Sequence, residues 1–180
     1  MRKVIAQFIL HRLMGWEIKG ELPDLNKFIV ILGSHTSNWD FVLAICTIWM
    51  VQVKVTIIGK KELFKFPFGS VFRALGVVPI ERRKSQNQVD AIAEMFDNRE
   101  NLVIAIAPEG TRKKVEIFKS GFYYIALKAN LPVVAVIIHG TTKTILIQKP
   151  YYNTRDKEID LKHFNHIFKS HTGIIPANSF

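Results

Sequence analysis

A histidine and an aspartate stand five positions apart in a polar segment that follows an apolar run. The run is Phe28 to Leu32, and the polar segment after it contains His35 and Asp40. A neutral imidazole can take the proton of a hydroxyl, and a carboxylate at its other ring nitrogen fixes the tautomer and stabilises the imidazolium. Inside one helix, two such residues would lie about 140° apart around the axis. The pair therefore predicts a general base only if His35 lies in a loop and Asp40 in the first turn of a helix.

The same segment also fits a helix cap. Ser37 to Asp40 has the spacing of a capping box, in which a hydroxyl and an acidic side chain satisfy the first amide groups of a helix. On that interpretation His35 is an ordinary loop residue. Both interpretations can hold at once, because a cap would fix the position of the carboxylate.

A second polar cluster is typical of an anion site. Gly110, Thr111 and Arg112 come shortly after another apolar run, from Leu102 to Ala107. A glycine lets a ligand approach the backbone, a threonine offers a hydroxyl and an amide, and the arginine guanidinium is a planar fork that matches phosphate. Arg82 follows a third apolar run and can reach the same anion. The alternative is a tight turn followed by solvated charges.

Short β-branched runs alternate with helical patterns along the chain, which predicts βαβ units. The continuous apolar strands indicate a mostly parallel sheet with helices on both faces, in a single α/β domain spanning residues 1–180. In such sheets functional groups gather beyond the carboxyl ends of the strands, which is where the polar segments fall. The predicted strands are residues 28–32, 53–58, 77–80, 102–107, 133–138 and 144–148, and the predicted helices are residues 39–50, 61–75 with a break at 67–69, 86–96, 122–129 and 160–169.

The polar segments resemble, in order and spacing, the four motif blocks of the glycerophospholipid acyltransferase family, which includes the bacterial 1-acylglycerol-3-phosphate acyltransferases. The blocks are residues 35–40, the Arg82 segment, residues 108–112 and residues 131–134, and the resemblance covers residues 28–140. Ser34 precedes the histidine where asparagine is usual, and Ala107 and Lys113 flank the third block in place of its usual neighbours. These departures concern the identity of the acceptor more than the chemistry.

The resemblance implies a glycerolipid acyltransferase-like fold and transfer of a fatty acyl group from a thioester, acyl-CoA or acyl carrier protein. The acceptor would be a hydroxyl of a lysophospholipid-like molecule, with 1-acylglycerol-3-phosphate the first choice. The resemblance assigns His35 as general base and Asp40 as its orienting partner, with no covalent intermediate, no cofactor and no metal. Lys119, after the third block, either extends the anion site or lies only at the surface, and the surface is the expectation. The residues assigned to the acceptor's phosphate are Arg82, Glu109, Gly110, Thr111 and Arg112.

Composition limits the partners and the compartment. The 25 Lys and Arg exceed the 15 Asp and Glu by ten, and the resulting charge of +10 favours an acidic partner such as an anionic membrane, a phosphorylated substrate or an acidic carrier. With 48% hydrophobic residues the chain is not a disordered tail. Cys46 is the only cysteine, which excludes an intramolecular disulfide framework. A reducing, cytoplasmic setting fits best, and a cysteine-poor periplasmic protein is the alternative.

Membrane contact is expected to be peripheral, on the cytoplasmic face. The longest apolar stretch, Phe41 to Val51, has 11 residues including one threonine, whereas a spanning helix needs about 20. Residues 2–14 form a short basic amphipathic pattern, so residues 1–20 are a predicted membrane-contact segment. Residues 60–73 interleave four phenylalanines with basic residues, which also suits an anionic surface. The alternative for both stretches is packing on the sheet, with their lysines reaching solvent.

Three alternatives stay open. The acceptor of the acyl group can be a different lipid or an amine. A hydrolase using His35, Asp40 and Glu109 would need a set of several metal-binding carboxylates that the sequence does not offer. A basic, non-enzymatic binder of membranes or nucleic acid would use aromatic residues among lysines and arginines. No nucleic-acid module signature is present and the His–Asp pair would have no task there, so we expect no nucleic-acid partner.

Overall fold

The computed structural model describes residues 1–80 and 85–179, with the backbone alone at residue 80 and residues 85–87. Within these ranges a seven-stranded sheet has the order β1-β7-β6-β2-β5-β3-β4. Neighbouring strands are parallel, except that β7 is antiparallel to β6. The strands are β1 (Glu17–Lys19), β2 (Lys27–Gly33), β3 (Val55–Lys60), β4 (Val77–Ile80), β5 (Leu102–Ile106), β6 (Val133–His139) and β7 (Thr144–Ile147).

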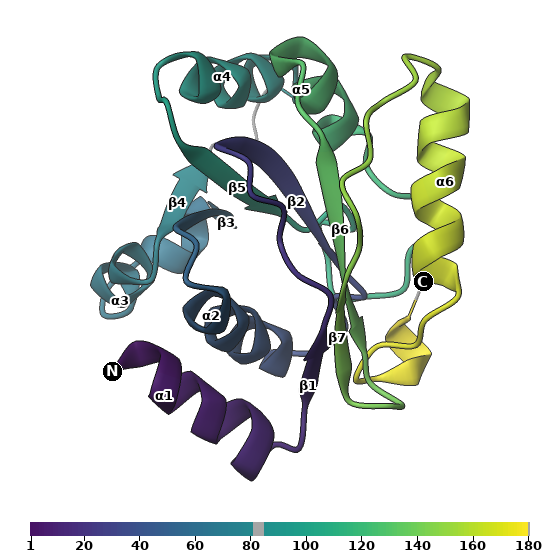
Figure 1. The fold of residues 1–180 in the computed structure, drawn as a ribbon. Coiled ribbons are helices and arrows are strands. Elements are labelled where there is room, and N and C mark those ends of the chain that lie inside the picture. Colours follow the sequence, from purple (N-terminus) through teal and green to yellow (C-terminus); the bar gives the residue numbers. More distant parts are fainter. Residues whose placement is uncertain (81–84, 180) are drawn as a thin grey trace.

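Helices cover both faces of this sheet (Figure 1). α1 and α2 lie on one face, and α4, α5 and α6 lie on the other, while α3 lies near β3 and β4. The α-helices are α1 (Arg2–Gln7), α2 (Trp39–Val51), α3 (Gly69–Ala74), α4 (Ser85–Asp97), α5 (Gly121–Ala129) and α6 (Lys157–Lys169). The shorter turns are the π-helical η1 (Phe8–Leu13), which continues α1, and the 3₁₀ turns η2 (Lys61–Phe64) and η3 (Pro176–Asn178).

Two hydrophobic cores lie on opposite faces of the sheet because side chains alternate along each strand. On β2, Ile29 and Ile31 pack toward α4, α5 and α6, whereas Phe28 and Val30 pack toward α1 and α2. Strands buried on both faces contain continuous apolar runs, which is why the sequence predicts a parallel sheet. The predicted fold class, α/β with a mostly parallel sheet and helices on both faces, is confirmed.

Some local predictions differ from the structure. The second predicted strand begins two residues later, at Val55, because Gln52 ends α2 in a left-handed conformation with φ 58° and the next residues form the link. The short strand β1 was missed, since three residues carry no periodic signal. The predicted break in the stretch 61–75 is confirmed: the stretch divides into η2 and α3, and Gly69 packs against the carbonyl of Phe64.

Strand order brings the polar segments together. β2 lies between β5 and β6, and the three strands run in the same direction. The chain therefore leaves Gly33, Ile106 and His139 at one edge of the sheet, the carboxyl edge that the sequence predicts for the site. The end of α6 also reaches this edge. A Cβ at Gly33 would lie 2.7 Å from the Phe168 ring, so a glycine is needed there.

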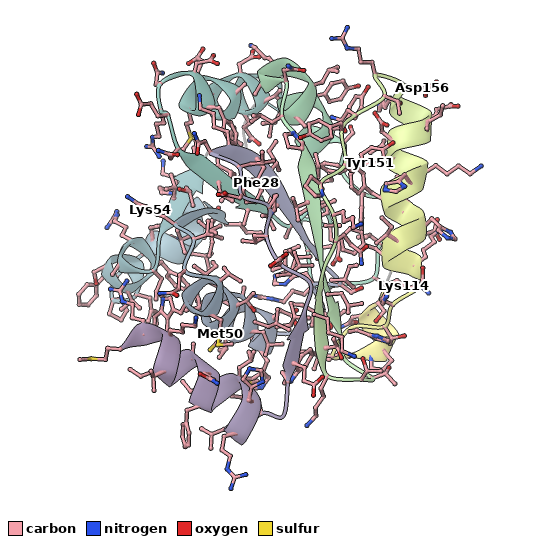
Figure 2. The ribbon with its side chains drawn as sticks, in the orientation of Figure 1. Phe28, Met50, Lys54, Lys114, Tyr151 and Asp156 are labelled. Atoms are coloured by element: carbon pink, nitrogen blue, oxygen red, sulfur yellow. The ribbon has the colours of Figure 1, made fainter. Side chains whose placement is uncertain are left out.

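A buried carboxylate attaches the beginning of α6 to the chain that precedes it. Asp160 accepts hydrogen bonds from the Tyr151 hydroxyl at 2.7 Å and from the Thr154 hydroxyl at 2.9 Å. Tyr151 points toward α6 (Figure 2). Burial, followed by the bond to Asp160, raises the pKa of Tyr151 to about 12, so the hydroxyl remains a donor at neutral pH. This attachment matters for the site because the residues after α6 return to it.

Candidate active site

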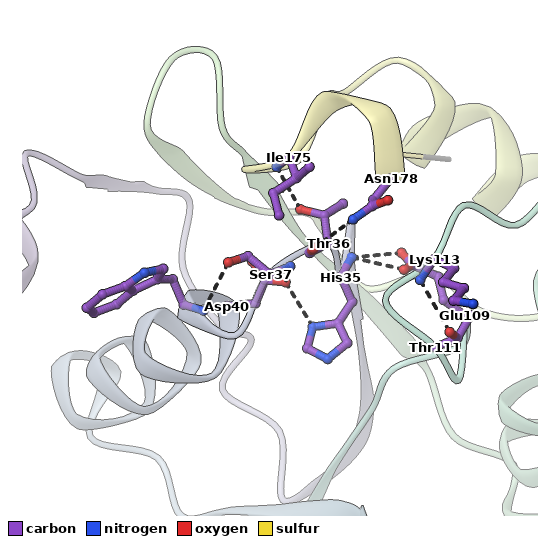
Figure 3. A network of polar contacts seen from close by, with 10 residues as sticks. His35, Thr36, Ser37, Asp40, Glu109, Thr111, Lys113, Ile175 and Asn178 are labelled. Atoms are coloured by element: carbon purple, nitrogen blue, oxygen red, sulfur yellow. Dashed lines mark hydrogen bonds and ion pairs between the residues drawn. The ribbon is translucent and has the colours of Figure 1, made fainter.

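The predicted pair of His35 and Asp40 is formed at the start of α2 (Figure 3). His35 lies in the loop before the helix and Asp40 in its first turn. Nδ1 of His35 is 3.1 Å from Oδ2 of Asp40, although the ring N–H is not aligned for a linear hydrogen bond. Asp40 is fully buried, and the His35 side chain is 19% exposed. Since Nδ1 faces the carboxylate, Nε2 is the nitrogen left for a substrate.

Asp40 also bonds to the backbone just before the helix, as in one half of a capping box, although the N-cap residue Asn38 makes no side-chain cap bond. Oδ2 of Asp40 accepts a hydrogen bond from the Ser37 N–H at 2.7 Å, and Ser37 Oγ accepts one from the Trp39 N–H at 3.2 Å. Oδ2 of Asp40 therefore both faces the His35 imidazole and accepts the hydrogen bond from the Ser37 N–H. This bond holds the carboxylate in place for His35. The general-base role of His35 stays a prediction.

Glu109 contacts the backbone of the His35 loop (residues 34–38). Both its carboxylate oxygens accept hydrogen bonds from the His35 N–H, at 2.9 and 3.0 Å. The side chain is buried. Burial raises the pKa of Glu109 to about 7, and the His35 N–H partly offsets that rise because it favours the charged form. This contact positions the loop, and the expected contact between Glu109 and the acceptor stays a prediction.

A cavity of about 1310 Å³ opens beside His35. Its interior is mostly apolar and is lined by α2, by the strands and by residues of α4 and α5, whereas basic side chains gather where the chain leaves β5. Gly110, Thr111 and Arg112 of the predicted anion site line this basic part. The apolar lining includes Ala44, Ile48 and Val51 of α2 and Val30, Leu32, Val55 and Ile57 of the sheet.

Lys119 lies at the predicted anion site, although its side chain is at the surface as expected. Gly110 has φ +65°, and a Cβ built on it would stand 2.7 Å from Lys119 Nζ. The ammonium group therefore lies over the glycine and lines the cavity beside it. Sequence spacing does not reveal this contact, because a loop separates the two residues. Arg82 falls outside the described residues, so its place in the site stays a prediction.

The structure adds one group of contacts that no motif indicates. The C-terminal segment (residues 170–179) returns to the His35 loop, where Thr36 accepts hydrogen bonds from the Ile175 N–H and from the Asn178 side chain. The partners lie 139 and 142 positions apart in the sequence, so no local pattern could have signalled them.

These features define a class of protein. It is an α/β protein with a histidine–carboxylate pair at the carboxyl edge of its sheet, beside an apolar cavity with basic residues at one end. Such a site can remove a proton from a hydroxyl of an amphipathic anion. Residues 17–139 match the sequence model of the acyltransferase family, and the chain belongs to that family. The resemblance carried by the motif blocks is thereby confirmed.

Individual relatives agree with this assignment. The chain is 29% identical to 1-acyl-sn-glycerol-3-phosphate acyltransferase of Haemophilus influenzae, over 78% of this chain and 61% of that protein. It is 34% identical to human 1-acyl-sn-glycerol-3-phosphate acyltransferase beta, over 71% of this chain and 45% of that protein. The chain thus spans about half the length of the curated relatives that it matches.

A solved structure shares the fold. The crystal structure of the 1-acyl-sn-glycerophosphate acyltransferase PlsC from Thermotoga maritima superposes with a TM-score of 0.64. The match covers 94% of this chain and 79% of that one, at 22% sequence identity. At this identity the likeness supports the fold alone.

Glu109→Gln is expected to change the pH dependence of stability. Between the ordinary pKa of 4.5 and the folded-state value of about 7, the native protein holds more protons at this carboxyl than the unfolded chain. Its contribution to stability is therefore present below the lower value and is lost as pH rises through the window. We expect the free energy of unfolding of the wild type, minus that of the variant, to fall as pH rises from 4.5 to about 7. Urea titrations at a series of pH values measure this difference. Glu116→Gln, at an exposed carboxylate, is the control, and a difference that is flat with pH would contradict the shift.

Proposed function

We propose that this chain transfers a fatty acyl group from a thioester donor, acyl-CoA or acyl carrier protein, to the free hydroxyl of a lysophospholipid, in phospholipid biosynthesis. The observation that carries the proposal is the His35–Asp40 pair beside an apolar cavity. 1-Acylglycerol-3-phosphate is the first candidate acceptor, which the names of the relatives support.

His35 acts as the general base. Nε2 takes the proton of the acceptor hydroxyl while the hydroxyl oxygen attacks the thioester carbonyl. The tetrahedral intermediate collapses as the carbon–sulfur bond breaks, and the imidazolium gives its proton to the departing thiolate. The products are an ester and a free thiol. Asp40 stabilises the imidazolium between the two proton transfers, from a distance of 3.1 Å.

The apolar cavity supplies the place for an acyl chain. Its lining by α2 and by the facing strands begins beside His35, so a chain lying there would bring its carboxyl end to the base. Burying methylene groups in such a cavity contributes roughly 0.8 kcal/mol for each one. The groove that a lipid substrate requires near His35 is therefore available.

The basic end of the cavity suits the acceptor's phosphate. The absence of a side chain at Gly110 leaves room for the Lys119 ammonium, and Lys119 and Arg112 present positive charge there. Thr111 Oγ1 accepts a hydrogen bond from the Lys113 N–H at 3.2 Å, which shapes this turn. An arginine fork and an ammonium group together match a phosphate monoester.

The helix formed by residues 2–14 has two apolar faces. Ala6 and Leu10 are fully buried in the core shared with α2, so one face packs on the protein. Val4 and Phe8 are 68% and 55% exposed on another face, near basic residues. We infer that this outer face lies at an anionic membrane surface.

Residues 60–73, the second basic and aromatic stretch, also have some aromatic rings packed on the protein and others exposed. The ring of Phe72 packs against the rings of Phe41 and Phe64, with centroid distances of 5.5 and 6.3 Å. Phe66 and Phe68, between η2 and α3, are 99% and 64% exposed. Exposed aromatic residues among lysines are suited to the headgroup region of a bilayer.

The mode of membrane attachment follows from these surfaces. None of the helices in the described part of the chain is long and apolar enough to cross a bilayer. We therefore infer peripheral attachment through the exposed faces of residues 2–14 and 60–73. The cytoplasmic leaflet is the proposed site, because its anionic lipids attract basic segments.

The deciding experiment measures thiol release from acyl-CoA and from acyl carrier protein against a panel of lysophospholipids, other hydroxyl acceptors and amines. We expect release that depends on a lysophospholipid, with the acylated acceptor identified by mass spectrometry. Release that yields only free fatty acid would instead indicate hydrolysis. Acylation of an amine in preference to a hydroxyl would correct the acceptor class.

His35→Ala should lower kcat by about 10²–10⁴-fold, which is the usual contribution of a positioned general base. Asp40→Asn should also be severe, because the amide cannot stabilise the imidazolium, although it keeps an oxygen for the helix cap. Both variants are compared by kcat and by melting temperature with His166→Ala, which changes an exposed histidine of α6. Normal turnover together with a lower melting temperature would mean that His35 only packs.

Arg112→Ala should raise the KM for the acceptor and leave the KM for the donor unchanged, because the guanidinium is proposed to bind the acceptor's phosphate. Lys114→Ala removes a nearby exposed charge and is the matched control. Steady-state kinetics with each substrate varied in turn separate the two constants. A change in the donor KM alone would indicate that Arg112 binds the thioester donor and not the acceptor.

Val4→Glu and Phe8→Glu should weaken binding to anionic vesicles while preserving activity on a short-chain, soluble acceptor. Substitution is preferable to deleting the helix, because Ala6 and Leu10 belong to the core. Ile159→Glu places the same charge on an exposed apolar residue of α6, on the other face of the sheet, and is the control. Vesicle binding equal to that of the wild type would remove this role from residues 2–14.

A further inference from the structure

The C-terminal segment packs against the His35 loop through three hydrogen bonds. The Ile175 N–H donates to Thr36 Oγ1 at 3.0 Å, and Nδ2 of Asn178 donates to the Thr36 carbonyl at 3.3 Å. In the opposite direction, Ser34 Oγ donates to the carbonyl of His171 at 3.4 Å. Figure 3 shows Ile175 and Asn178 on either side of Thr36, above the His35 ring. The residues on both sides of His35 are therefore tied to the C-terminal segment.

The contact between the two segments is close and partly buried. Ser34 is fully buried and Thr36 is 2% exposed, so the loop's side of these hydrogen bonds is shielded from water, whereas the partners in the C-terminal segment are partly exposed. A Cβ at Gly173 would lie 2.6 Å from Thr36 Cγ2, which means that the backbone of the C-terminal segment rests on this side chain. Any side chain at Gly173 would push the two segments apart.

The C-terminal segment is itself held in place. The Gly140 N–H, just after β6, donates to the Thr172 carbonyl at 2.7 Å. The Gly173 N–H donates to Ser179 Oγ at 2.9 Å, which closes the segment on itself around η3. His171 packs its ring edge-to-face on His139, with the ring centroids 5.1 Å apart. The segment is therefore a firm support, anchored on β6 and α6.

His35 is thus held between two supports. On one side Glu109 accepts the His35 N–H, and on the other side the C-terminal segment binds Thr36. The imidazole projects from the backbone between these contacts, toward Asp40 and the cavity. A displacement of the loop backbone would carry Nδ1 away from the carboxylate, because the backbone of Asp40 belongs to α2, which packs in the core, and the loop holds the carboxylate through the Ser37 N–H.

We propose that residues 171–179 form a clamp that positions His35 for catalysis, with Thr36 and Asn178 as positioning residues. The proposal rests on the proposed function, because it assigns the clamp to the same general base. It extends the catalytic machinery beyond the residues that match the family, which end at residue 139. The clamp acts on turnover rather than on substrate affinity, since none of its hydrogen bonds reaches the substrate cavity.

Thr36→Val tests the clamp because valine keeps the shape of threonine and removes the oxygen that accepts the Ile175 N–H. We expect kcat to fall by about 10- to 100-fold, the effect of misplacing a catalytic group by up to about 1 Å. The KM values for donor and acceptor should stay within about twofold of the wild type. Thr36→Ser keeps the accepting oxygen and should restore most of kcat. Thr144→Val, at another buried and hydrogen-bonded threonine, controls for lost stability.

Asn178→Ala tests the second contact, the hydrogen bond to the Thr36 carbonyl. It is an independent test if Thr36→Val fails to fold. It should lower kcat in the same direction, with unchanged KM. Asn98→Ala is the matched control, because Asn98 also donates to a backbone carbonyl but lies at the end of α4. Its kcat should equal that of the wild type.

A spectroscopic measurement tests the clamp without relying on turnover. In protein labelled with ¹⁵N-histidine, the ring signals of His35 are assigned from their loss in His35→Ala. Thr36→Val and Asn178→Ala should shift or broaden these signals, whereas Thr144→Val and Asn98→Ala should not. A structural role alone would lower the melting temperature and leave the His35 signals in place.

The outcomes separate the clamp from the proposed function. If the wild type lacks acyl transfer, the proposed function fails, and the His35 signals still report whether the clamp positions the ring. If the wild type is active and both clamp variants keep normal kcat and unchanged His35 signals, the clamp is overturned. A rise in KM at constant kcat would overturn it as well, since that pattern belongs to a binding residue.

Discussion

One oxygen of Asp40 sets the geometry on which the site depends. It is buried at the start of α2, where it accepts the Ser37 N–H at 2.7 Å and faces His35 Nδ1 at 3.1 Å. A buried charge is costly unless donors surround it, and a helix N-terminus offers free amides and a favourable dipole. Here the helix start supplies a donor to Oδ2, whereas Oδ1 is buried without a hydrogen bond in the described part of the chain, and the carboxylate can in turn stabilise an imidazolium. The oxygen that orders the segment before α2 is thus the one that faces the imidazole of the proposed general base.

Two buried carboxylates flank the His35 loop in different environments. Asp40 lies at a helix start, where Oδ2 accepts the Ser37 N–H, whereas Glu109 lies under the loop, where one N–H serves both oxygens. Burial accordingly raises the pKa of Glu109 to about 7. A protonated carboxyl still offers an accepting oxygen, so Glu109 can hold the His35 N–H on either side of neutral pH. Its support of the loop is therefore less sensitive to pH than its charge.

The sequence predicts the parts of this arrangement that depend on local chemistry or on periodicity. The spacing of His35 and Asp40 works because one loop and one helical turn bring them together, and continuous apolar runs reveal the parallel sheet. Strand order then accounts for Glu109 lying near His35. The spacing indicates which segments meet but not which atoms do, so the bond from Glu109 to the backbone was not predicted. The contact of Lys119 with Gly110 was missed for the same reason.

The contacts that hold the His35 loop form over three ranges of sequence. The hydrogen bond from the Ser37 N–H to Asp40 joins residues three positions apart and needs only the first turn of α2. The bond to Glu109 spans 74 positions and requires β2 and β5 to pair. The bonds to the C-terminal segment span about 140 positions and require α6 to dock, which depends in turn on Asp160 and Tyr151 at its other end. If the position of the His35 imidazole depends on all three contacts, as proposed, it is set only when the whole sheet and its last helix are assembled. The structural unit that serves His35 therefore extends to Ser179.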